Sequence, residues 1–248
     1  MEIQWVPFLG VLARAAGLLG TMPVLSGLYI PGIVRVGLAV LVALALYPAV
    51  AVPFPEDFLT ASLWILAETV TGLAIGLLAQ ILFSAIQMAG SLLDLDLGLG
   101  VAGLLDPVGH QPVSVLGNFF NLTGSLLYLL TGAYAVPFLA LRYSFEGLPP
   151  GTFSGGSFAL DMAAALSTAF LAAVQLALPV IAVSFVVTVA MAVFARAIPQ
   201  MNVFLLGLPL KIALGLLALG LLLPAYRGMM EVLFPSEAAF LLPGGMQP

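Results

Sequence analysis

Residues 196–211 read R-A-I-P-Q-M-N-V-F-L-L-G-L-P-L-K and form a polar joint between two long apolar runs. Pro199 and Pro209 each lack a backbone N–H group, so we expect both to interrupt regular helix. Polar side chains stand where the backbone would be freed, namely Arg196, Gln200, Asn202 and Lys211. Because free backbone groups are not tolerated in hydrocarbon, the joint should be buried against protein.

The composition is that of a membrane protein. Of 248 residues, 62% are apolar and 7% are charged, and the apolar runs exceed the roughly 20 residues that cross a hydrocarbon core. The net charge of -5, with no basic cluster, argues against nucleic acid as a partner. Cysteine is absent, which excludes disulfides and thiolate metal sites. The first run lacks a preceding positive region and contains Arg14, so we expect it to be retained rather than cleaved.

Six apolar runs predict an all-α, polytopic membrane protein with six helical segments. They cover residues 5–29, 33–52, 58–93, 113–141, 159–195 and 203–226. Turn residues separate them, as in Pro31-Gly32 and in residues 142–156, which contain Pro149-Pro150-Gly151. Since there is no internal repeat and no composition boundary, we expect one helical domain over residues 1–248, with 235–248 as a mobile tail.

Two of these runs are too long for one membrane crossing. Residues 58–93 and 159–195 each hold about 36 residues, or roughly 54 Å of helix, against a core of about 30 Å. Steep tilt, a kinked pair of half-helices, or a tight hairpin at Pro179 would accommodate them. So would projection out of the bilayer with apolar faces covered by other subunits, which we favour.

On this view the polar joint becomes the turn of a helical hairpin that packs against other subunits. Its polar groups then act as helix caps and as hydrogen-bond partners between subunits. The residues assigned to this role are Arg196, Pro199, Gln200, Met201, Asn202, Gly207, Pro209 and Lys211. Elsewhere Gly72-x-x-x-Gly76 allows two helix backbones to approach closely.

Residues 89–112 place three aspartates among leucines and glycines. At about 2.5–3.5 kcal/mol each, Asp94, Asp96 and Asp106 would cost roughly 8–10 kcal/mol if all faced lipid at mid-depth. They must therefore face protein, water or the interface, and we expect a glycine-rich loop folded inside the structure. The glycines also spell G-x-G-x-x-G, but no strand precedes them and Asp106-Pro107 cuts off the helix that would cradle pyrophosphate, which argues against dinucleotide binding.

The polar residues do not indicate an enzyme. Asp94 and Asp96 lie about 200° apart on a helix, so they would not converge on one ligand. His110 stands alone and is expected in a loop, and neither H-E-x-x-H nor G-x-S-x-G occurs. A proton or ion relay stays open, because intramembrane carboxylates are functional candidates. Arg14 and Glu68 are expected to be structural, with Arg14 snorkelling or pairing with a partner's carboxylate.

Two motifs resemble the FliR family of flagellar export proteins. One is residues 89–116, with its A-G, D-x-D-x-G and Asp106-Pro107 elements and with P-V-S-V-L-G, whose glycine is Gly117. The other is the R-A-I-P-Q-M-N-V-F-L-L-G-L-P-L-K joint. Chain length, six apolar segments and motif order also match, so the resemblance covers nearly the whole chain. The injectisome SctT family is homologous and shares much of the pattern.

The resemblance implies a subunit of the type III secretion export gate in the bacterial inner membrane, at the flagellar basal body. It implies assembly with FliP and FliQ into a cone-like complex that passes unfolded proteins, with FlhB and FlhA below it. The implied fold joins FliP-like and FliQ-like helical hairpins in one chain, held largely above the membrane plane. Membrane lipid is then expected to contact the chain. The resemblance implies no cofactor, metal or catalytic residue.

The resemblance also implies a plug in the closed pore. Carried over by position, it falls on about residues 96–112, with Asp96, Gly98, Gly100, Val101, Gly103, Leu104, Asp106, Pro107 and Gly109 as its candidate residues. Some relatives place aromatic residues where this chain has Val101 and Leu104, which leaves open how tightly the plug seals. Two rival classes remain, a small-molecule transporter, for which no paired broken helix is evident, and a membrane enzyme, for which no convergent acid set is evident.

Overall fold

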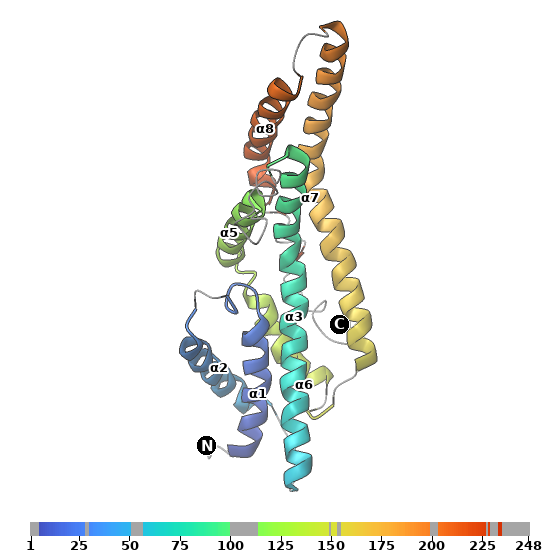
Figure 1. Cartoon of the computed structure of the whole chain (residues 1–248). Helices are drawn as coiled ribbons and strands as arrows, with labels where there is room; N and C mark the ends of the chain where they lie inside the picture. Colours follow the sequence, from blue (N-terminus) through green and yellow to red (C-terminus); the bar gives the residue numbers. More distant parts are fainter. Residues whose placement is uncertain are drawn as a thin grey trace, which may run out of the picture. The chain divides into compact units, whose positions relative to one another are not determined.

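The computed structural model describes residues 5–27, 30–50, 57–99, 114–148, 150–152, 155–198, 203–226, 228 and 233–234. Every element within these ranges is helical (Figure 1), which confirms the predicted all-α class. The α-helices are α1 (Trp5–Thr21), α2 (Gly32–Leu46), α3 (Phe58–Leu97), α5 (Val115–Leu130), α6 (Ala135–Gly147), α7 (Gly155–Ala197) and α8 (Val203–Leu222). Two short 3-10 helices, η1 (Tyr47–Ala49) and η2 (Leu223–Ala225), follow α2 and α8.

The two overlong helices are continuous. α3 holds 40 residues and α7 holds 43, which at 1.5 Å per residue gives about 60 and 65 Å. Pro179 lies inside α7 without ending it, so the alternative of a tight hairpin at Pro179 is wrong. By length and composition α3 and α7 can each cross a membrane, and a third span results if α5 and α6 count as one broken helix.

The fourth apolar run is two helices rather than one. α5 ends at Leu130 and α6 begins at Ala135, with Gly132 at φ +77 between them. Such a backbone conformation costs a residue with a Cβ about 1–2 kcal/mol, and glycine avoids that cost. Hydropathy alone could not reveal this break, because Ala133 and its apolar neighbours continue the run.

Helix bounds also differ from expectation at the two motifs. Pro209 lies inside α8, so the predicted helix break there is wrong. A proline removes one backbone hydrogen bond, and an apolar helix with intact bonds on both sides can continue through it. α3 runs on to Leu97, and Gly98 at φ +78 follows its last residue. Asp94 and Asp96 are therefore helical, and the expected loop cannot begin at Asp96.

The chain divides into two compact units. The first comprises residues 1–82, 132–167 and 234–248, and the second comprises residues 83–131 and 168–233. In the first unit α1 lies directly against α3. A Cβ at Gly17 of α1 would come 2.5 Å from the Thr69 carbonyl oxygen of α3, and a Cβ at Gly76 of α3 would come 2.7 Å from the Leu18 carbonyl oxygen of α1. At Gly72 it would overlap the Arg14 carbonyl. Gly72 and Gly76, the candidates for helix packing, thus lie in the α1–α3 contact.

In the second unit the C-terminal part of α3 runs antiparallel to α5. Gly90 meets the backbone at Leu116, Gly124 meets Ile86, and the rings of Phe83 and Tyr128 stand edge to face at 5.6 Å between centroids. α8 lies beside the C-terminal part of α7 (Figure 1), and residues of both line a common groove. A Cβ at Gly90 would come 2.5 Å from the Leu116 carbonyl oxygen, so only glycine permits this approach.

Candidate functional site

The most buried polar cluster belongs to the first unit and centres on Arg14, which is fully buried on α1. Its Nε donates to Glu68 Oε2 on α3 at 2.7 Å, and its Nη2 donates to Glu68 Oε1 at 3.0 Å. Its Nη1 donates to Ser144 Oγ on α6 at 2.9 Å. The guanidinium also stands 4.1 Å from the ring centroid of Phe145, within the range of a cation–π contact.

Glu68 is held from a second direction as well. The Gly151 N–H donates to Glu68 Oε1 at 2.7 Å, and the Ser144 hydroxyl donates to the Leu141 carbonyl at 2.7 Å. A buried ion pair offsets its desolvation only when further hydrogen bonds satisfy both groups, as they do here. The cluster ties three helices and the turn at Gly151 together. The expected pairing of Arg14 is thus made inside this chain, with Glu68.

A second polar cluster lies in the second unit where α3 meets α5. Asp94 is buried, and both of its carboxylate oxygens accept from the Leu116 N–H at 3.1 Å. The Ser114 hydroxyl donates to Asp94 Oδ2, while Ser114 Oγ accepts from the Gly117 N–H at 2.9 Å. Asp94 therefore faces protein and not lipid, as its charge requires.

Asp96 has a different partner. Lys211 Nζ on α8 donates to Asp96 Oδ1 at 3.3 Å, and both side chains are partly exposed. Asp96 Oδ2 has no hydrogen-bond partner among the described residues. The two aspartates point to different sides of α3. Asp94 bonds to α5 and Asp96 bonds to α8, so they do not converge on one ligand. No group of three or more histidine, aspartate or glutamate side chains in the described part of the chain could hold a metal ion.

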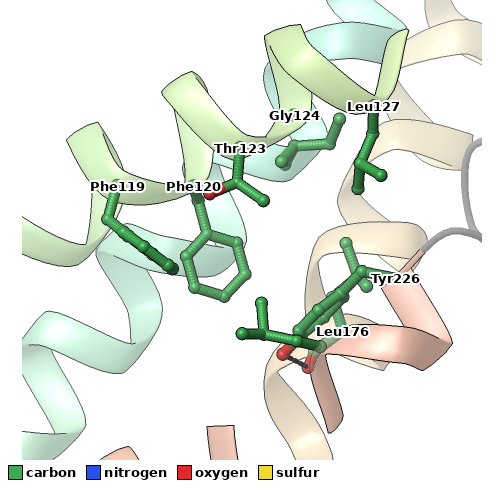
Figure 2. Close-up of a pocket in the computed structure, with 9 residues that line it drawn as sticks. Phe119, Phe120, Thr123, Gly124, Leu127, Leu176 and Tyr226 are labelled. Carbon is green, nitrogen blue, oxygen red and sulfur yellow. Dashed lines mark hydrogen bonds between the residues drawn. The ribbon is translucent and has the colours of Figure 1, made fainter. Parts of the chain in front are cut away.

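The described residues of the second unit line a groove and a small cavity. A groove of about 500 Å³ runs between α7 and α8, lined by Val187, Thr188, Met191, Ala192, Gly207, Leu208 and Lys211. Figure 2 shows the other, an apolar cavity of about 20 Å³ between α5, α7 and η2. Its lining includes Phe120 and Tyr226, whose rings stand edge to face at 5.2 Å between centroids. Such a cavity is too small for a drug-sized ligand, which needs roughly 300 Å³ or more.

Tyr226 closes one side of that cavity. Its hydroxyl donates to the Leu176 carbonyl at 3.4 Å (Figure 2). A phenol is uncharged at physiological pH, so this hydroxyl acts as a hydrogen-bond donor.

The structure describes only part of the two predicted motifs. In the joint, Arg196 is exposed in the last turn of α7, and Gly207, Pro209 and Lys211 lie in α8. The remaining joint residues, Pro199, Gln200, Met201 and Asn202, lie outside the described residues. Of the plug residues, Asp96 and Gly98 are described; Gly100, Val101, Gly103, Leu104, Asp106, Pro107 and Gly109 are not, nor is His110.

Sequence reasoning missed the residues that complete each cluster. Ser144 and Gly151 complete the Arg14 cluster, and Ser114 with the Leu116 N–H completes the Asp94 cluster. One signal was available. Ser114 lies at the start of the fourth apolar run, directly before Val115, and serine is a favoured N-cap residue.

The sequence matches a family model described as bacterial export proteins, family 1, over residues 5–236. It is 33% identical over 243 residues to flagellar biosynthetic protein FliR of Pectobacterium carotovorum subsp. carotovorum, covering 97% of this chain and 93% of that protein. FliR of Bacillus subtilis (strain 168) is 31% identical over 218 residues, covering 86% and 84%. Yop proteins translocation protein T of Yersinia pestis is 32% identical over 207 residues, covering 80% and 78%. These likenesses confirm the resemblance to FliR, and the chain belongs to the bacterial export proteins of family 1.

Proposed function

We propose that this chain is a structural, pore-forming subunit of the flagellar type III protein export gate. The observation that carries the proposal is the likeness to proteins named flagellar biosynthetic protein FliR, at 30–34% identity to four of them over most of the chain. With homologues of FliP and FliQ, the chain forms the conduit for unfolded flagellar proteins. It has no catalytic role, so the energy for export comes from other subunits, among which FlhA and FlhB homologues act below the gate.

The exposed apolar surface of α7 and α8 supports assembly with other chains. α7 exposes large side chains along its length, among them Leu160, Phe170, Phe185 and Phe194, and α8 exposes Leu217 and Leu221. Soluble monomers rarely expose contiguous apolar patches beyond a few hundred Å². A helix of about 65 Å exceeds a core of about 30 Å, so lipid cannot cover all of this surface at once. Other subunits of the gate cover the rest.

The joint, residues 196–211, is proposed to be covered in the same way. Arg196 and Ile198 are exposed in this chain, so their burial requires another subunit. The polar groups of the joint then form hydrogen bonds between subunits rather than a transport site.

The segment between α3 and α5 is proposed as the plug of the closed pore. Gly98, which follows α3, supplies the left-handed conformation that turns the chain away from the helix. A segment that cargo must displace should make few strong contacts, and small residues with apolar neighbours meet that requirement. Because Asp96 is helical, the plug begins at Gly98 or later.

The gate is proposed to lie in the bacterial inner membrane, within the flagellar basal body, with lipid around its membrane-facing part. The alternative is the homologous subunit of a virulence injectisome, favoured by the 32% identity to the Yersinia translocation protein. The flagellar assignment is preferred because likeness to the Pectobacterium FliR covers 97% of the chain, against 80% for the Yersinia protein. A small-molecule or ion transporter is the least supported alternative.

Co-purification tests the assignment. We expect the tagged chain, expressed together with FliP and FliQ homologues, to elute from size-exclusion chromatography as one large particle that contains all three. A stable monomer that binds a small molecule would contradict the proposal. An export defect of a flagellar deletion strain, restored by this gene, would distinguish the flagellum from the injectisome.

A further inference from the structure

The first turn of α5 is capped by two side chains, one of which belongs to another helix. Ser114, the N-cap, accepts from the Gly117 N–H at 2.9 Å, and Asp94 on α3 accepts from the Leu116 N–H at 3.1 Å. Amides in the first turn of a helix have no acceptor within that helix. The Leu116 amide therefore depends on Asp94, which stands 22 residues earlier in the chain.

The Asp94 carboxylate is suited to this place. It is only 3% exposed, and a buried charge is costly unless it is paired or hydrogen-bonded. The positive end of the α5 dipole, the Leu116 N–H and the Ser114 hydroxyl together supply that compensation. The Ser91 hydroxyl extends the chain of hydrogen bonds by donating to Ser114 Oγ at 3.3 Å.

The C-terminal end of α3 is held on its other side by α8. Asp96 pairs with Lys211, and a Cβ at Gly98 would come 2.8 Å from Leu208 Cδ1. At Gly215 of α8 a Cβ would come within 3.0 Å of the Leu97 side chain. The last turn of α3 thus contacts α5 through Asp94 and α8 through Asp96 and Leu97. Asp94 carries the only buried charge among these described contacts of the α3 end.

We propose that Asp94 is a positioning residue for export, which fixes the start of α5 against the end of α3. The inference rests on the proposed function, because the segment proposed as the plug leaves α3 and enters α5 at these two points. Asp94 does not touch cargo. It sets the separation and direction of the two helix ends, and its loss lets the start of α5 move without removing any apolar contact between α3 and α5.

Amide hydrogen exchange of the co-purified particle tests the cap directly. In Asp94→Ala we expect exchange at Leu116 to accelerate by roughly tenfold, the size expected for a lost N-cap. Asp94→Asn keeps an oxygen acceptor without the charge and should restore part of the protection. Unchanged protection of the Leu116 amide in Asp94→Ala would contradict the claim that Asp94 caps this amide.

The functional consequence is measured on the same particles in lipid vesicles. We expect Asp94→Ala to co-purify with its partners in normal yield but to conduct small ions above the wild-type level, with Asp94→Asn between the two. Faster Leu116 exchange together with wild-type conductance and export would overturn the positioning role. Should Asp94→Ala fail to fold, Ser114→Ala provides the same test, because it removes the hydroxyl that bridges Asp94 and α5.

Asp57→Ala is the matched control. Asp57 is an exposed aspartate at the start of α3 that accepts from the Thr60 N–H at 3.5 Å, so its loss removes a cap of the same chemistry in the first unit. Leu116 exchange and conductance should stay at the wild-type values. An equal leak in Asp57→Ala would overturn the assignment to Asp94. Failure of the wild-type chain to co-purify would instead refute the proposed function, while exchange in the isolated chain would still test the cap.

Discussion

Arg14 and its partner Glu68 are separated by 54 residues of sequence. The sequence marks each of them as costly in an apolar segment, and so predicts structural roles, with Arg14 either snorkelling or paired with a carboxylate. It cannot tell which carboxylate pairs with Arg14, because the pairing depends on the register of α1 against α3. That register follows from backbone contacts at Gly17, Gly72 and Gly76, which no propensity scale contains. The same holds for Asp94, for which the sequence predicts contact with protein, water or the interface but not the partner on α5.

Arg14→Met should be among the most destabilising single substitutions in the first unit. It leaves Glu68 buried without its cation, which costs about 3–5 kcal/mol. The double variant Arg14→Met/Glu68→Gln removes the uncompensated charge and should recover part of that loss. Thermal unfolding of the chain in detergent measures both. Arg196→Met, at an exposed position, serves as control and should change the free energy of unfolding by less than about 0.5 kcal/mol. Equal losses of stability in Arg14→Met and Arg196→Met would contradict a stabilising role of the Arg14 cluster.

Gly72→Ala should destabilise the contact between α1 and α3. Its Cβ would overlap the carbonyl oxygen of Arg14, a backbone atom that cannot rotate away. Overpacking of this kind costs about 1–3 kcal/mol. Gly20→Ala on α1 is the matched control, since a Cβ there meets nothing within 4 Å, and it should stabilise the helix by up to about 1 kcal/mol. A lower unfolding temperature is expected for the first variant only, and a neutral Gly72→Ala would argue against the close approach.

Among the elements, the long helices were the most predictable. Their apolar runs are unmistakable, and α3 and α7 confirm the expectation of helices longer than a bilayer core. The ends and breaks were less predictable. Pro209 was expected to break a helix that in fact continues, and Gly132 breaks a run that was expected to continue. Hydropathy reports whether a residue can be buried, whereas a break depends on one backbone angle.

Gly132→Ala isolates the cost of that backbone angle. A Cβ at Gly132 meets nothing within 4 Å, so any loss of stability comes from its φ of +77 alone. We expect about 1–2 kcal/mol of destabilisation. Gly220→Ala in α8 has equally open surroundings and lies in regular helix, so it should be neutral or stabilising. Paired thermal unfolding curves measure the difference, and indistinguishable curves would contradict a break enforced by Gly132.

At the scale of the whole molecule, composition established a membrane protein, and two motifs pointed to the export family to which the chain belongs. Physical reasoning alone could not have named that family, because neither a glycine-rich loop nor a polar joint specifies cargo. The apolar side chains exposed on α7 and α8 are consistent with the proposed assembly, in which other subunits and lipid would cover them. A single chain gives no reason for them, whereas neighbouring subunits and lipid do.

The ion conductance of the reconstituted particle tests the proposed conduit most directly. Removal of residues 98–109 should leave assembly with FliP and FliQ homologues intact, because the Arg14 cluster and the α7–α8 surfaces are unaffected. Gly220→Ala, a substitution in open surroundings on α8, is the control and should leave the particle closed. We predict that vesicles with the deletion variant conduct small ions while wild-type and control vesicles do not. Equal conductance of the deletion variant and the wild type, at equal particle content, would contradict the account.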